Sequence, residues 1–79
     1  MRVHVNGESK ELENGLSLYS LIEQLELPTQ RIAVELNREV VRKSEWPITS
    51  LNDGDRIEIV HFVGGGSTFA SSINSVYSP

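Results

Sequence analysis

Polar and apolar side chains alternate at the start of the chain. In Arg2–Val5 the two valines occupy every second position, which predicts a half-buried strand. Asn6-Gly7 follows, and because both residues tolerate a positive φ, this pair predicts a hairpin turn. A short return strand is therefore expected from Ser9 to Leu12, before Asn14-Gly15 ends it.

The apolar spacing then changes to that of a helix. Four aliphatic side chains follow the i, i+3, i+4, i+7 rule and share one helix face: Leu18, Leu21, Ile22 and Leu25. Ser17 is placed to cap this helix, because its hydroxyl oxygen can accept a backbone N–H of the first turn. Pro28 is expected to stop the helix.

Alternation returns after the helix. Ile32–Leu36 predicts a strand, Asn37-Arg38 a turn, and Glu39–Val41 a returning strand. Trp46-Pro47 disfavours a long strand and predicts a short 3₁₀ turn or a loop. The indole of this pair is expected to act as a lid over the small core rather than to stack on a ligand.

A tight turn at Asp53-Gly54-Asp55 leads into the last predicted strand, Arg56–Val63. The predicted order is strand, strand, helix, strand, strand, short turn and strand. A hairpin, a helix across one sheet face and further strands together make a two-layer α+β domain.

The last strand has an irregular alternation. Ile57 and Ile59 share one phase and are expected to face the helix. The opposite phase ends in Val60 and Phe62, so an apolar pair is expected to point outward as a docking surface, or else to pack under a neighbouring loop. His61 falls in the core phase near the strand end, where it is expected to be an edge residue rather than a catalyst.

Three consecutive glycines, Gly64-Gly65-Gly66, follow this strand. Because glycine loses the most entropy on ordering, such a run forms either a linker or a thin, pliable strand that can enter a narrow channel in another protein. The run also marks a boundary, since every charged side chain precedes it and the serine-rich remainder has none. The sequence therefore predicts a domain over 1–63, a flexible glycine tail over 64–66 and a C-terminal extension over 67–79.

Composition narrows the classes of function. A chain of 79 residues forms one small domain. The net charge of −4 argues against nucleic-acid binding. It would either attract the chain to a basic surface of a partner protein or only keep the chain soluble. The absence of cysteine excludes thiol chemistry, and with His4 and His61 as the only histidines no metal site is predicted. No apolar run approaches the roughly 20 residues of a membrane span, and a cytoplasmic location is expected.

Three segments of the chain resemble the ThiS family, the sulfur carriers of thiamine biosynthesis. They are Arg2-Val3-His4-Val5-Asn6-Gly7, Asp53-Gly54-Asp55 and Ile57-Glu58-Ile59-Val60-His61-Phe62-Val63-Gly64-Gly65-Gly66. The resemblance covers Met1–Gly66. It implies a ubiquitin-like β-grasp fold, with a mixed four- to five-stranded sheet, one main helix packed on one face, and adjacent, parallel first and last strands.

The resemblance also implies a function. After processing, the carboxylate of Gly66, preceded by Gly65, would be adenylated by a ThiF-like E1 adenylyltransferase that uses ATP and Mg²⁺. Sulfur from a donor such as a cysteine desulfurase would replace AMP, and the thiocarboxylate would supply the ThiG thiazole synthase. The chain would bind no cofactor itself and would act as a carrier, not an enzyme. Its expected partner-binding residues are Val60, Phe62, Val63 and Gly64.

The chain departs from the family pattern because Ser67–Pro79 follows Gly66, so no free carboxylate exists there. This extension is a propeptide that a processing protease removes, a product of the expression vector or of frame-shifted translation, or a lasting element joined by a glycine linker. Its apolar residues fit a marginal amphipathic helix, and its serines fit disorder equally well. A cut after Gly65 would also leave a diglycine end.

Other functions share these features. A ubiquitin-like modifier or a molybdopterin-type sulfur carrier would use the same activated glycine, and the modifier would end in isopeptide bonds to lysine side chains. A β-grasp binding module would use the domain surface, with the glycines as a linker. An enzyme is not predicted, because no nucleophile–base pair or ligand cluster recurs at useful spacing.

Overall fold

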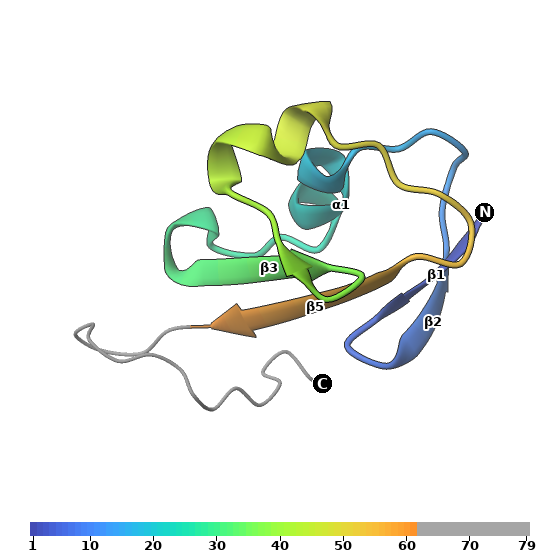
Figure 1. The fold of residues 1–79 in the computed structure, drawn as a ribbon, viewed down its shortest axis with the longest axis horizontal. Helices are drawn as coiled ribbons and strands as arrows, with labels where there is room; N and C mark the ends of the chain where they lie inside the picture. Colours follow the sequence, from blue (N-terminus) through green and yellow to red (C-terminus); the bar gives the residue numbers. More distant parts are fainter. Residues whose placement is uncertain (62–79) are drawn as a thin grey trace.

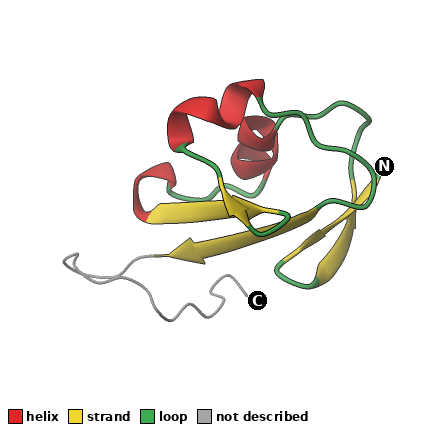
Figure 2. Cartoon of the chain, in the orientation of Figure 1, coloured by secondary structure: helices red, strands yellow, loops and turns green. Residues whose placement is uncertain are grey.

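A computed structural model describes residues 1–61 of the chain. Within them, five strands form one mixed sheet in the order β2-β1-β5-β3-β4, and the helix α1 lies with the 3₁₀ segment η2 over one sheet face (Figure 1, Figure 2). The strands are β1 (Arg2–Val5), β2 (Glu8–Glu11), β3 (Ile32–Leu36), β4 (Glu39–Val40) and β5 (Arg56–His61). The helical segments are α1 (Leu18–Gln24), η1 (Thr29–Arg31) and η2 (Lys43–Ile48). The predicted two-layer α+β domain is confirmed.

Both predicted hairpins form, and each turns through residues with positive φ. The φ angles are 49° at Asn6 and 88° at Gly7 in the first turn, and 52° at Asn37 and 75° at Arg38 in the second. Two successive positive φ values match the right-handed twist of the flanking strands, which is why such turns join short antiparallel pairs. The β2 strand begins at Glu8, one residue earlier than expected.

The helix begins as predicted and ends earlier. Ser17 caps α1, because its Oγ accepts a hydrogen bond from the backbone N–H of Ser20 at 3.1 Å. The helix ends at Gln24, before Pro28 is reached, and Glu26 takes a φ of 59°. Pro28 is therefore not the residue that ends α1, because the left-handed conformation of Glu26 already ends the helix. Pro28 instead precedes η1.

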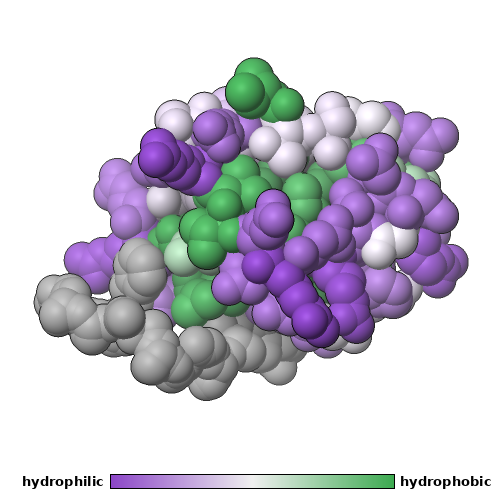
Figure 3. Space-filling view, viewed as in Figure 1, coloured by the Kyte–Doolittle hydropathy of each residue, from purple (hydrophilic) through white to green (hydrophobic). Residues whose placement is uncertain are grey.

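The core lies between the sheet and the helical layer. On the face shown in Figure 3, apolar side chains gather near the centre, with polar side chains around them. The core consists of Val3, Val5, Leu18, Leu21, Ile22, Ile32, Val34, Trp46, Leu51, Ile57 and Ile59. Trp46 enters this cluster from η2 and is 2% exposed. Its indole N–H donates to the Val41 carbonyl oxygen at 3.0 Å, so the polar edge of the ring is satisfied although the ring is buried.

The first and last strands are parallel neighbours, as the resemblance implies. His4 lies opposite Arg56 and Val5 opposite Ile57, after which β1 ends while β5 continues. The side chain of Asn6 then takes the place of a strand residue. Its Oδ1 accepts from the Ile59 N–H at 2.8 Å, and its Nδ2 donates to the Ile59 carbonyl oxygen at 3.3 Å. Asn6 thus extends the hydrogen-bonded edge of β5 beyond the end of β1.

A second asparagine holds the beginning of β5. The Oδ1 of Asn37 accepts from the Arg56 N–H at 2.9 Å, while its Nδ2 donates to Asp55 Oδ1 at 3.0 Å. The other carboxylate oxygen of Asp55 accepts from the Asn52 N–H at 2.7 Å, which closes the preceding turn. Asp55 is only 9% exposed, and these bonds offset the cost of burying its charge. Each hairpin turn therefore supplies one asparagine side chain to β5.

None of the helices in the described part of the chain is long and apolar enough to cross a membrane.

Replacing Asn6 with glycine tests its contact with β5. Asn6→Gly keeps a residue that tolerates positive φ and removes both side-chain bonds to Ile59, so the free energy of unfolding should fall by about 1–2 kcal/mol. Urea denaturation measures this loss, and amide exchange at Ile59 should accelerate. Asn37→Gly is the matched control: it should speed exchange at Arg56 and leave Ile59 protected. Unchanged exchange at Ile59 in Asn6→Gly would show that the side chain does not hold the strand.

Candidate functional site

The candidate site begins where β5 ends. β5 lies in the middle of the sheet, and its last residue, His61, is opposite Ile32 at the start of β3. Of the six residues expected to react or to bind partners, only Val60 belongs to the described part of the chain. The others lie outside the described residues, and their roles stay predictions: Phe62, Val63, Gly64, Gly65 and Gly66. The predicted domain and tail boundaries after residues 63 and 66 also lie there.

Buried and more exposed side chains alternate along β5 as predicted over most of the strand. Ile57 and Ile59 are 0% and 2% exposed and belong to the core. Val60 has the opposite phase, is half-buried, and lies opposite Ala33 of β3 outside the core cluster. Val60 therefore lies on the sheet face turned away from α1, as the alternation predicts.

His61 does not follow the phase of the core. Its side chain is exposed, although two isoleucines of the same phase on β5 are buried and Ile32, its partner on β3, belongs to the core. Its exposure at the strand end fits the expected edge residue.

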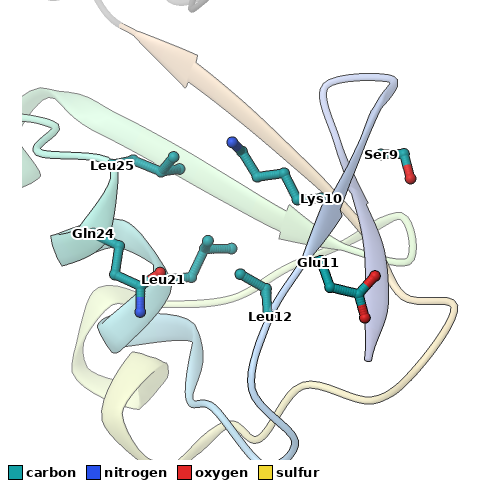
Figure 4. Close-up of a pocket in the computed structure, with 7 residues that line it drawn as sticks. All are labelled: Ser9, Lys10, Glu11, Leu12, Leu21, Gln24 and Leu25. Atoms are coloured by element: carbon teal, nitrogen blue, oxygen red, sulfur yellow. The ribbon is translucent and has the colours of Figure 1, made fainter.

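A groove of about 390 Å³ lies on the other side of the molecule, between β2 and the end of α1. Leu12, Leu21 and Leu25 form its apolar floor, and the stem of Lys10 lies along it, whereas Ser9 and Glu11 point away from the helix (Figure 4). Glu11 instead pairs with Arg2 at 3.2 Å. The groove thus contains no carboxylate, hydroxyl or imidazole group aimed into it that could act as a nucleophile or base.

A second, smaller cavity of about 100 Å³ lies beside β5 and is lined by His4, Gly7, Arg56, Ile57 and Glu58. Within residues 1–61, no three side chains of histidine, cysteine, aspartate or glutamate gather as metal ligands would. One tyrosine on α1, Tyr19, is affected by its neighbour: a hydrogen bond to Glu23 and the charge of that carboxylate raise the pKa of the phenol above its usual value. Tyr19 belongs to α1, whereas Val60 lies on the sheet face turned away from this helix.

The asparagine side chains that hold β5 were not apparent from the sequence. The local pattern identifies Asn6 and Asn37 only as turn residues, and nothing in it shows that their amides reach a strand more than eighteen residues away. Both asparagines directly follow a strand that neighbours β5, which is the one signal that could have indicated this role.

Residues 3–66 match the sequence model of the ThiS family. The sulfur carrier protein ThiS of Thermus thermophilus is 38% identical over 64 residues, which are 81% of this chain and 98% of that protein. A crystal structure of the thiamine biosynthesis protein (ThiS) from Geobacter metallireducens superposes with a TM-score of 0.75 at 32% identity, covering 84% of this chain and all of that one. The β-grasp fold implied by the sequence is therefore confirmed, with five strands in the sheet.

A second kind of relative is much longer. A thiazole synthase of Paramagnetospirillum magneticum is 39% identical over 72 residues, which are 91% of this chain but 22% of that protein. The chain thus spans about a fifth of that relative's length. Because 72 residues exceed the 66 that end at Gly66, this similarity continues past the glycine run.

Alanine substitutions at Ile59 and Val60 test the assignment of the two faces of β5. Ile59→Ala should lower the free energy of unfolding by about 2–5 kcal/mol, because it opens a cavity in the core. Val60→Ala should cost about 1 kcal/mol or less, since the side chain lies outside the core cluster. Chemical denaturation of both variants provides the comparison. Equal losses would mean that Val60 is a core residue and not part of an outward surface.

Proposed function

The chain belongs to the ThiS family, and we propose on that basis that it is a sulfur carrier for the thiazole of thiamine, with the carboxylate of Gly66 as its working group. One observation carries the proposal: the family match begins at residue 3, runs through the rest of the described domain and ends at Gly66. The residue that the match ends on is the one whose carboxylate would be activated.

The proposed function requires the Gly66 carboxylate to react, but a carboxylate at neutral pH is a poor electrophile and must first be activated. Attack of a carboxylate oxygen on the α-phosphorus of ATP would release pyrophosphate and leave an acyl adenylate, in which AMP is a good leaving group. The terminal sulfur of a donor persulfide would then attack the acyl carbon and expel AMP, which would give an acyl disulfide. A thiol reductant would cleave its S–S bond, leaving the thiocarboxylate and a disulfide between the reductant and the donor. ATP and Mg²⁺ would be bound by a ThiF-like adenylyltransferase, and the sulfur would come from a donor such as a cysteine desulfurase.

The domain's own part is recognition and delivery. The β-grasp domain presents Val60 on its open face, just before the segment that leads to the glycines. A short run of glycines has no side chains to clash with the walls of a narrow channel, which suits entry into a partner's active site.

The peptide bond between Gly66 and Ser67 must be broken before this chemistry can begin. The similarity to a thiazole synthase that continues past the glycines favours a natural extension over a product of the expression vector. We assign Ser67–Pro79 to a segment that a protease removes, because the chemistry needs a free Gly66 carboxylate. We propose thiazole synthase as the partner that consumes the thiocarboxylate. The alternative of a lasting linker would leave Gly66 as an amide, with no oxygen free to attack ATP.

The proposed function can be tested with a chain that ends at Gly66. This chain is incubated with a ThiF-like enzyme, ATP, Mg²⁺ and a sulfur donor. Such a chain keeps every core residue, and the Geobacter protein folds over the matching length. Intact mass spectrometry should show the increase for exchange of one oxygen for one sulfur. The chain that continues to Pro79 is the control and should stay unmodified. Lysine adducts in place of a thiocarboxylate would instead indicate a ubiquitin-like modifier.

A further inference from the structure

The sheet face turned away from α1 is open across β4, β3 and β5 in the described part of the chain (Figure 2). The strand register places three side chains in one row across it, since Val40 lies opposite Glu35 and Glu35 lies opposite Glu58. Directly opposed residues of antiparallel strands share a face, with Cβ atoms about 5 Å apart. The two carboxylates are therefore neighbours at the centre of the open face.

These two carboxylates have no cationic partner within the described residues. The ion pairs found there join Glu11 to Arg2 and to the N-terminal amine. Arg56 shares the face of Glu58 two residues earlier on β5, yet the two form no ion pair. Residues 62–79 contain no lysine or arginine that could supply a cation. Two like charges directly opposed across a pair of strands repel each other, and no ion pair in residues 1–61 involves either of these two carboxylates.

Apolar side chains flank the two carboxylates on either side. Val40 is 70% exposed on β4, although it is a large aliphatic residue. Ala33 and Val60 form the next row toward the end of β5 and are half-buried. From Glu58 to the end of β5 is three residues, or about 10 Å at the rise of a strand. A protein that takes up the tail beyond β5 is therefore within reach of the two carboxylates.

We propose that Glu35 and Glu58 together receive a guanidinium group from the protein that takes up the glycine tail. Both the guanidinium head and the aliphatic stem of an arginine side chain fit this surface. Its planar head can donate to two carboxylates at once, and its aliphatic stem can pack on Val40 or Val60. Contact with a partner would remove the carboxylates from water and replace their mutual repulsion by two charge-assisted hydrogen bonds. This inference rests on the proposed function, because it names a contact of the partner that activates Gly66.

The substitution Glu58→Lys distinguishes a binding role from a structural one. In the free domain a lysine at this position faces Glu35 and replaces repulsion by attraction, so the melting temperature should stay the same or rise. In the complex the same lysine would repel the incoming guanidinium. The affinity of the chain ending at Gly66 for the ThiF-like enzyme should therefore fall at least about tenfold. Calorimetric titration and thermal unfolding provide the two measurements.

Glu8→Lys is the matched control, since it makes the same change of charge at an exposed strand position. Glu8 pairs with the core residue Val5 and so belongs to the other sheet face. Its variant should bind the enzyme as the unsubstituted chain does. Glu58→Gln removes the charge with little change in volume, so it should weaken binding and reduce the dependence of affinity on salt.

Three results would overturn the inference, and each is separable from failure of the proposed function. Equal losses in Glu58→Lys and Glu8→Lys would show an effect of net charge alone. If Glu58→Lys binds the enzyme as tightly as the unsubstituted chain, and that chain is adenylated normally, the proposed function stands but the proposed arginine contact is wrong. If Glu58→Lys abolishes self-association of the chain and leaves enzyme binding unchanged, this face is an interface between copies of the chain. A chain ending at Gly66 that is never adenylated would contradict the proposed function itself.

Discussion

The hydrogen bonds along both edges of β5 are the interaction on which the candidate site depends. The strand pairs with β3 over five residues on one side, but with β1 over only two on the other. Beyond that short ladder, the Asn6 amide bonds both backbone groups of Ile59. Without it, the second half of the strand would have one open edge. Because the glycine run follows β5 in the chain, these bonds hold in place the strand that precedes the proposed reactive carboxylate.

A well-held strand followed by a run of glycines suits a protein that works by delivery. The core gives β5 a fixed position in the sheet, and Ile57 and Ile59 anchor it from the helical side. The opposite face of the strand is the one proposed to meet a partner, with Glu58 opposite Glu35 on β3 and with Val60 nearest the end of β5. Recognition would thus depend on the open sheet face, whereas the chemistry would depend on the carboxylate at Gly66.

Local sequence patterns predict most elements of this fold but not their register. The valines of β1, the apolar stripe of α1 and the residues of both turns identify their elements, because each signal lies within a few residues. The contact between Glu35 and Glu58 joins two strands far apart in the chain, and no period reveals such a pairing. Parallel pairing of the first and last strands came from the family resemblance. The early end of α1 depends on a positive φ at Glu26, which the residue type does not indicate.

The native C-terminus of the domain tests the central claim most directly. The claim is that the Gly66 carboxylate is latent in this chain and is released by cleavage before Ser67. Intact mass spectrometry of the protein isolated from its own cells should find a product that ends at Gly66, alone or with sulfur in place of one oxygen. If every molecule that contains this domain retains the bond between Gly66 and Ser67, the account is contradicted.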